Sequence, residues 1–348
     1  MPPRLFSTSS PPFLSEFKKL TTESTVCHYP LASSIDRNVP IYVLPDYASL
    51  SPAELFALQD EWYHIFLSGP GVFVTRELYK DISLLDRVNE VYNPQSFLEY
   101  YANPCLPLIS STWLGPHHRL TVQVNVVKPG AAAQISHRDY HIGFQGNESC
   151  AKFPKAIHVA SQFLTLQGAV AQSEMPLRSG PTCLMPFSQK FEEGYMAYRI
   201  PEFQQFFLEN YISLPLEKGD RLFFNPALFH AAGQNDSANM QRSENLLQIS
   251  SAFGKPMEMV DTLPLIELTW ESMLKKYKAE GLSDEVKAFV GNVAEGYPFP
   301  TNFNRRVPEA SGMAPSSEQS VLCGGLEKSW SKEAILGELR KMRQDAAA

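Results

Sequence analysis

The chain has 348 residues, 44% hydrophobic and 19% charged, which is enough to bury a large core and excludes disordered, collagen-like and coiled-coil classes. Its formal net charge of −7 gives no electrostatic reason to expect nucleic acid or an anionic membrane as a partner. No apolar run approaches the roughly 18 residues that a membrane-spanning helix needs. We therefore expect a globular protein that acts on a small molecule; its oligomeric state is not readable.

The cysteines indicate the redox compartment. The chain has five cysteines, none of which belongs to a CxxC pair: Cys27, Cys105, Cys150, Cys183 and Cys323. This scatter argues against a zinc ribbon or a disulfide scaffold and for a reducing compartment. The first twenty residues lack the apolar core of a signal peptide but carry Arg4, several serines and few acids. The default expectation is the cytoplasm, with mitochondrial or peroxisomal localisation as the alternatives.

The first part of the chain predicts an arm followed by helices. Residues 1–40 are rich in Ser, Thr and Pro, so we expect a loosely structured N-terminal arm over residues 1–44. Ser51-Pro52-Ala53-Glu54 is typical of a helix start, with a capping serine, a proline at the first helical position and an early acid. Beyond this helix we expect a strand, a second helix and an irregular stretch, at residues 72–74, 80–92 and 93–118.

The middle of the chain predicts mostly strands. Thr121 to Val127 alternates polar and apolar residues, as a half-buried strand does, and further strands are expected at 156–167, 221–224 and 246–253. Short strands separated by Gly, Pro, Asn and Asp turns indicate a sandwich or barrel of antiparallel sheets, a mainly β fold with flanking helices. The helices are expected at 195–211, 257–280, 284–295 and 331–344. The domains would be the arm, a main domain over 45–310 and a C-terminal extension over 311–348.

One short stretch can hold a metal. In an extended segment, side chains two residues apart share a face and lie about 6.6 Å apart, so His137 and Asp139 can bind one ion. His141, about 13 Å from His137, is too far unless the chain turns. By itself the His-x-Asp pattern is more often a surface or core pair. With His230 as third ligand, two imidazoles and one carboxylate form the facial triad of non-haem Fe(II) oxygenases.

A downstream arginine extends this pattern. Non-haem iron needs a two-electron co-reductant to split O2, and 2-oxoglutarate supplies it by chelating the metal. The distal carboxylate of 2-oxoglutarate then needs a bidentate partner, and the guanidinium of Arg242, twelve residues after His230, fits that role. The alternative is an exposed arginine that is solvated or paired with Glu244.

Together these residues resemble the phytanoyl-CoA dioxygenase (PhyH-like) family of Fe(II)/2-oxoglutarate-dependent oxygenases. The similarity covers roughly residues 45–255 and rests on an ordered set of motifs: Gln123-Val124-Asn125, His137-Arg138-Asp139, Ser179-Gly180-Pro181-Thr182, Lys218-Gly219-Asp220, residues 229–237 and Arg242. One departure is that many relatives carry a Pro-Gly-Ser-His turn where this chain has Met185-Pro186-Phe187-Ser188-Gln189.

The resemblance implies a double-stranded β-helix (jelly roll, cupin-like) core with iron at one mouth. It makes His137, Asp139 and His230 the iron ligands and Arg242 the 2-oxoglutarate anchor. Thr182 or Ser243 would add a hydroxyl to the same carboxylate, and Gln134 or Gln123 would reach the other end of 2-oxoglutarate or the substrate.

The expected function is that of a dioxygenase with Fe(II), 2-oxoglutarate and O2. It would hydroxylate a C–H bond of a small organic or lipid-like substrate and release succinate and CO2. The carboxylate of Asp139 argues against a halogenase, whereas the sequence does not choose among hydroxylation, desaturation, epoxidation and endoperoxidation. Two alternatives stay open: a cupin-like metal-dependent hydrolase or isomerase without cosubstrate, and a non-catalytic binding protein on the same fold.

Overall fold

The computed structural model describes residues 3–25, 29–44, 49–79, 81–88 and 93–347, which form two compact units. The sheet unit consists of Met1–Ile82 and Val122–Ile249, and the helical unit of Ser83–Thr121 and Ser250–Ala348. Each unit is therefore assembled from two separate stretches of chain. These units cut across the segments 1–44, 45–310 and 311–348, whose boundaries remain predictions.

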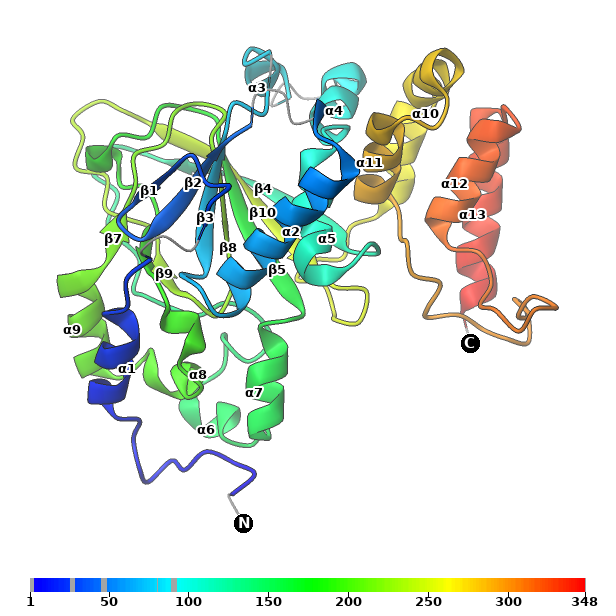
Figure 1. Cartoon of the computed structure of the whole chain (residues 1–348). Coiled ribbons are helices and arrows are strands. Elements are labelled where there is room, and N and C mark those ends of the chain that lie inside the picture. The colour runs from blue at the N-terminus through cyan, green and yellow to red at the C-terminus, as the bar shows by residue number, and fades with distance from the viewer. Residues whose placement is uncertain (1–2, 26–28, 45–48, 80, 89–92, 348) are drawn as a thin grey trace. The chain divides into compact units, whose positions relative to one another are not determined.

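Two sheets form the core of the sheet unit (Figure 1). In spatial order the major sheet contains β1 (Ser34–Asp36), β2 (Val39–Val43), β3 (Val72–Arg76), β8 (Arg221–Phe224), β5 (Thr165–Ala171), β10 (Arg242–Ser250) and β4 (Arg119–Val127). The minor sheet contains β7 (Ile212–Ser213), β6 (Cys183–Met185) and β9 (Phe229–Ala231). Strand β8 pairs antiparallel with both β3 and β5, whereas β2 pairs parallel with β3. This sheet-rich core with flanking helices confirms the predicted fold class.

Alternation along β8 shows how the core is built. Leu222 and Phe224 point into a buried cluster that also contains residues of β3 and the minor sheet, such as Val74 and Leu184. Phe223, between them, points to the opposite face, where its ring lies 5.8 Å from that of Phe73. The space between the sheets is therefore apolar along most of its length.

Helices cover the outer faces of both sheets. Helix α2 (Pro52–Leu67) stacks the Trp62 ring on Phe73 of the major sheet, with 5.3 Å between ring centroids. Its predicted start is confirmed, because Ser51 and Glu54 form a reciprocal capping box. Helices α1 (Leu14–Thr21) and α9 (Pro201–Asn210) lie side by side (Figure 1), and they share a hydrophobic cluster with β6 and β9. The remaining helical segments of this unit are short: α6 (Asn147–Cys150), α7 (Lys155–Ser161), η2 (Leu177–Ser179), η3 (Ser188–Lys190) and α8 (Gly194–Ala197).

The arm predicted over residues 1–44 is more ordered than expected. It contains α1, β1 and β2, and β2 joins the major sheet in register with β3. Phe17 of α1 is completely buried among aromatic rings of α9 and β9. Composition alone missed these elements because their stability comes from contacts with distant segments rather than from local propensity.

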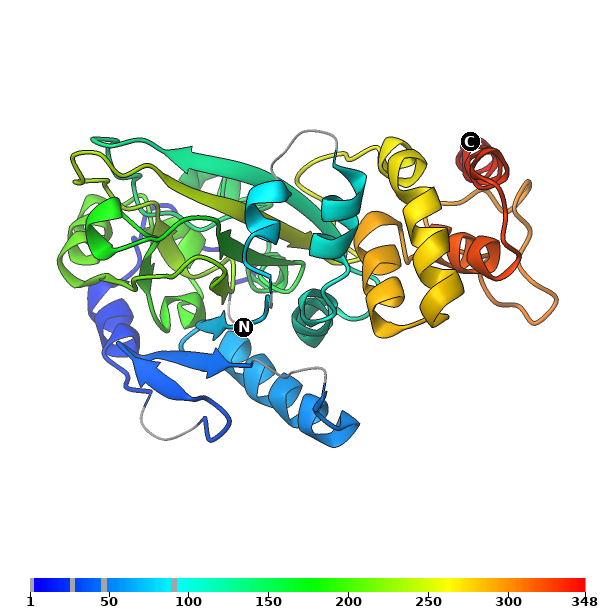
Figure 2. The same cartoon turned by 90° about the horizontal axis from the view of Figure 1, so that it is seen from above.

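The helical unit contains seven helices within the part of the chain that the structure describes (Figure 2). They are α3 (Leu84–Arg87), α4 (Pro94–Tyr101), α5 (Cys105–Leu114), α10 (Thr262–Glu280), α11 (Asp284–Val293), α12 (Glu318–Glu327) and α13 (Lys332–Ala346). The start of α13 is confirmed, because the hydroxyl of Ser331 accepts from the backbone N–H of Ala334. Among the described residues, no helix has both the length and the apolar character needed to cross a membrane.

The prediction of an irregular stretch over residues 93–118 is wrong. Asn93 caps α4 by accepting from the N–H of Ser96, and Pro94 occupies the first turn, where a missing N–H costs nothing. Pro104 is the N-cap residue of α5, directly before the first helical residue. Of the helix expected at 80–92, α3 is the part that lies within the described residues; residues 80 and 89–92 lie outside them.

A second wrong prediction concerns residues 156–167. The apolar alternation there belongs to helix α7, whose Ile157 and Val159 side chains are exposed, and the strand β5 begins only at Thr165. A short alternating pattern does not by itself distinguish one turn of helix from a strand. The helix expected over 195–211 is divided into α8 and α9 by Pro201, which starts the second helix.

Candidate metal centre

Backbone pairing brings the two predicted histidines together. His137, beyond the end of β4, forms an isolated antiparallel bridge with His230 of β9. The N–H of each residue donates to the carbonyl oxygen of the other, over 2.9 and 3.1 Å. Side chains of directly opposed residues share a face, and the two ring centroids lie 4.5 Å apart. Residues 93 positions apart in the sequence thus become neighbours.

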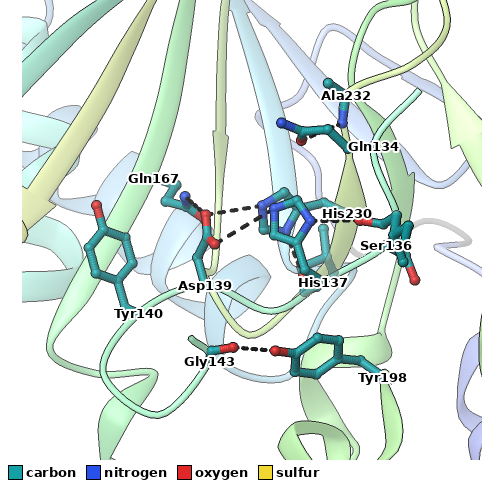
Figure 3. A network of polar contacts seen from close by, with 12 residues as sticks. Gln134, Ser136, His137, Asp139, Tyr140, Gly143, Gln167, Tyr198, His230 and Ala232 are labelled. Carbon is teal, nitrogen blue, oxygen red and sulfur yellow. Dashed lines mark hydrogen bonds and ion pairs between the residues drawn. The ribbon is translucent and has the colours of Figure 1, made fainter. Parts of the chain in front are cut away.

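Asp139 completes the group from the same segment. Its backbone N–H donates to the carbonyl oxygen of Pro226, and its carboxylate points at the two imidazoles (Figure 3). The Oδ1 atom lies 3.6 Å from Nε2 of His137, and Oδ2 lies 3.4 Å from Nε2 of His230. One ligand atom from each residue lies within 4.8 Å of the others, and the described residues contain no other such group of three metal-binding side chains.

Both imidazoles are oriented with a free nitrogen toward the centre of the group. Nδ1 of His137 bonds to the carbonyl oxygen of Ile135 over 2.9 Å, and Nδ1 of His230 bonds to that of Leu228 over 2.8 Å. A carbonyl oxygen only accepts, so each Nδ1 carries the proton and each Nε2 presents a lone pair. Metal-binding histidines in proteins have this arrangement.

The protonation states suit a divalent cation. Burial lowers the pKa of His137, and the neighbouring His230 lowers it further, so this imidazole is neutral at neutral pH. Burial alone would raise the pKa of Asp139, but its close contacts with His230, His137 and Gln167 lower it to about 2, so the carboxylate is ionised at neutral pH. Two neutral imidazoles and one carboxylate are the donor set that non-haem Fe(II) accepts, and three coordination positions stay open. The residues therefore fit iron.

Arg138, between the two metal-binding candidates, points the other way. Its guanidinium is buried, donates to the carbonyl oxygens of Ser188 and Phe191, and lies over the rings of Tyr195 and Phe229. Burial lowers the pKa of Arg138 to about 10, so it stays charged at neutral pH. Arg138 thereby anchors the side of this segment opposite His137 and Asp139, because neighbouring side chains of an extended segment point in opposite directions.

Sequence reasoning missed a glutamine that holds the carboxylate. Nε2 of Gln167, on β5, donates to Oδ2 of Asp139 over 2.5 Å and contacts Oε1 of Gln248 on β10 over 3.4 Å. The hydroxyl of Tyr140 donates to the same Oε1 atom. The sequence signal for this residue was a glutamine within an apolar strand. It was missed because the strand was predicted to begin at residue 156, nine residues before β5 begins at Thr165.

Removing this amide is expected to weaken iron binding. Gln167→Leu keeps the side-chain volume but leaves Asp139 free to rotate, and partners of metal ligands typically contribute about 10- to 100-fold in metal affinity. Anaerobic calorimetric titration with Fe(II) measures the change. Gln205→Leu, on the exposed side of α9, removes an amide away from the site and should bind iron like the wild type. Equal iron affinity in both variants would refute the role of Gln167.

Beyond Asp139 the chain turns, which decides the position of His141. Tyr140 and His141 have φ angles of 72° and 48°, in the left-handed region, and His141 does not join the metal group. Tyr140 is buried and lies on the side of Asp139 away from the imidazoles (Figure 3). Both ring nitrogens of His141 are buried without a hydrogen-bond partner.

Arg242, the predicted cosubstrate anchor, is the first residue of β10 and is completely buried. The alternative of an exposed arginine is therefore wrong, but its pairing with Glu244 is real: Nη1 lies 3.0 Å from Oε1 of that residue. The Nε and Nη2 atoms of Arg242 have no hydrogen-bond partner. Two buried donors of one guanidinium thus remain available for a carboxylate.

The other residues predicted to contact the cosubstrate or the substrate are Ser243, Thr182, Gln134 and Gln123. Ser243 follows Arg242 on the strand and so faces the opposite side of the sheet. Thr182 is partly exposed just before β6, and its carbonyl oxygen accepts from Ser213. Gln134 is exposed, and its Oε1 accepts from the N–H of Ala232 next to the histidine pair (Figure 3). Gln123 is an exposed residue of β4.

A known family model matches the part of the chain that contains this site. The family model described as phytanoyl-CoA dioxygenase (PhyH) matches residues 74–243, a range that includes His137, Asp139, His230 and Arg242. No curated protein sequence matches the chain significantly.

Several solved structures are similar at low identity. EvdMO1 is 16% identical with a TM-score of 0.33, and the match covers 45% of this chain and 32% of EvdMO1. The epimerase SnoN, in complex with Fe3+, alpha ketoglutarate and nogalamycin RO, is 15% identical with a TM-score of 0.40, over 61% of this chain and 93% of SnoN. The non-heme monooxygenase ThoJ, as a Ni complex, is 15% identical with a TM-score of 0.32, over 46% of this chain and 55% of ThoJ.

The family match confirms the relationship, enzyme class and cofactors predicted from the motifs. Residues 74–243 are a domain of the phytanoyl-CoA dioxygenase (PhyH) family, which is a family of non-haem Fe(II)/2-oxoglutarate-dependent enzymes.

Proposed function

We propose that this enzyme is a dioxygenase that hydroxylates a C–H bond of a small organic or lipid-like substrate. In that reaction one atom of O2 enters the substrate as a hydroxyl group and the other enters succinate, while 2-oxoglutarate loses CO2. The observation that carries the proposal is the converging group of His137, Asp139 and His230, with each Nδ1 proton held by a backbone carbonyl.

Each residue has a proposed role. Nε2 of His137, Nε2 of His230 and one carboxylate oxygen of Asp139 hold the iron, and Gln167 keeps the carboxylate in place. Arg242 binds the distal carboxylate of 2-oxoglutarate through its two unpartnered N–H groups. Iron and 2-oxoglutarate together supply the electrons that activate O2 when both are bound. Thr182, Ser243 and Gln134 remain proposed as further contacts of cosubstrate or substrate.

The partner and compartment follow from composition. We propose a small-molecule substrate and no nucleic acid, because the chain carries a net charge of −7. We propose the cytoplasm, with mitochondria or peroxisomes as alternatives, because the four cysteines among the described residues are free thiols.

An anaerobic titration of the Fe(II)-loaded protein with 2-oxoglutarate tests the proposal. Bidentate chelation of iron by 2-oxoglutarate produces a weak visible charge-transfer band, which should appear and saturate. Iron binding without such a band would favour a metal-dependent hydrolase or isomerase. A band without any 2-oxoglutarate turnover across a broad set of substrates would favour a binding protein.

A further inference from the structure

The inner face of β10 connects the predicted cosubstrate anchor with the metal centre. Arg242, Glu244 and Gln248 are separated by even numbers of residues, so their side chains lie on the same face of the strand. All three are buried. Gln248 contacts Gln167, which binds Asp139, so this end of the face adjoins the metal group. Glu244 therefore lies on this face between Arg242 and the end that adjoins the metal group, where 2-oxoglutarate would lie if it bound both.

The contacts of Glu244 are incomplete. Its Oε1 atom accepts from Nη1 of Arg242 over 3.0 Å and from Nδ2 of Asn125, on β4, over 3.2 Å. Its Oε2 atom is buried without a partner, as are Nε and Nη2 of Arg242. One carboxyl oxygen and two guanidinium donors are therefore unpaired at the same place. Buried polar groups are normally paired, so this arrangement indicates a ligand that contacts both residues.

The balance of charge determines whether Glu244 binds that ligand in its ionised or its protonated form. The positive charge of Arg242 already balances an ionised Glu244, and a second carboxylate would leave this buried place with a net negative charge. The two neighbouring groups identified in the described part of the chain, Asn125 and Cys183, supply no positive charge. Asn125 is a neutral amide, and burial raises the pKa of Cys183, on β6, to about 11, so that thiol is neutral. Burial also raises the pKa of Glu244 itself, although Arg242 and Asn125 oppose this rise.

We propose that Glu244 is a second binding residue for the distal carboxylate of 2-oxoglutarate and that it acts in its protonated form. The hydroxyl at Oε2 donates to one carboxylate oxygen, while Nε and Nη2 of Arg242 donate to the same group. The proton comes from solvent, and the cosubstrate keeps both its negative charges. This inference rests on the proposed function, because it assumes that 2-oxoglutarate binds at Arg242.

The affinity for 2-oxoglutarate should fall as the pH rises. If Glu244 is ionised in the free enzyme and protonated in the complex, each 2-oxoglutarate bound takes up one proton. Its affinity then falls about tenfold for each pH unit above the pKa of Glu244 in the free enzyme. An arginine that binds the carboxylate alone would show neither proton uptake nor this slope.

Anaerobic calorimetry of the Fe(II)-loaded enzyme with 2-oxoglutarate, in two buffers of different ionisation enthalpy, counts the protons directly. The charge-transfer band gives the affinity from about pH 6 to about pH 9. In Glu244→Gln the amide donates without a proton from solvent, so we expect no uptake and an affinity independent of pH. Glu338→Gln, on the exposed surface of α13, is the matched control and should behave like the wild type.

The outcomes separate this inference from the proposed function. Saturable binding with no proton uptake and no pH slope in the wild type overturns the role of Glu244 and leaves the oxygenase intact. A wild type without a charge-transfer band at any pH overturns the proposed function and this inference with it. The proton count needs only the wild type, so it decides the question even if Glu244→Gln does not fold.

Discussion

Replacing His230 by alanine is expected to abolish iron-dependent turnover while the fold is retained. The imidazole supplies one of three ligand atoms, so its loss should lower the Fe(II) affinity by more than the ~100-fold upper range for partners of metal ligands. The backbone N–H and C=O groups that pair residue 230 with His137 do not depend on the side chain. The sheet register should therefore survive the substitution.

Anaerobic Fe(II) titration and 2-oxoglutarate decarboxylation measure this effect, and thermal unfolding followed by circular dichroism checks the fold. His117→Ala is the matched control, because His117 is exposed and lies outside the metal group. Measurable 2-oxoglutarate decarboxylation in the His230→Ala variant would defeat the assignment of the metal centre.

Replacing Arg242 by alanine should raise the 2-oxoglutarate requirement far more than it changes the iron content. Arg242 is absent from the metal group, and the free donors of its buried guanidinium are suited to a carboxylate. Losing a hydrogen bond to a charged group costs about 1.5–3 kcal/mol, on the order of ten- to a hundredfold in affinity. The concentration of 2-oxoglutarate at half-maximal charge-transfer absorbance gives this number directly.

The Arg242→Ala variant should be compared with a double variant, because the single substitution leaves Glu244 buried without its cationic partner. Breaking a buried ion pair from one side typically destabilises a protein by about 3–5 kcal/mol. Arg242→Ala combined with Glu244→Gln removes both charges and isolates the effect on the cosubstrate. If iron and 2-oxoglutarate binding fall equally in both backgrounds, the anchor lies elsewhere.

The fold was predictable where local rules decide it. The capped start of α2 at Ser51 and the terminal helix after Ser331 are sequence signals with a mechanism, since a serine hydroxyl accepts from an N–H that the helix leaves unpaired. Strands β4 and β8 were equally readable from alternation and an apolar run. The errors at 93–118 and 156–167 came from prolines that start helices and from an alternation too short to assign.

The candidate residues His137, Asp139, His230 and Arg242 could be proposed from the sequence, because few residue types bind iron and a dicarboxylate and their order along the chain is restrictive. Only the tertiary structure could show that His137 and His230 pair across a bridge, that Gln167 holds Asp139 and that Arg242 is buried with two unpaired donors. These contacts join strands far apart in the chain. Residue chemistry and local capping are properties of the sequence, whereas the partner of each buried polar atom is set by strand register and the packing of the sheets.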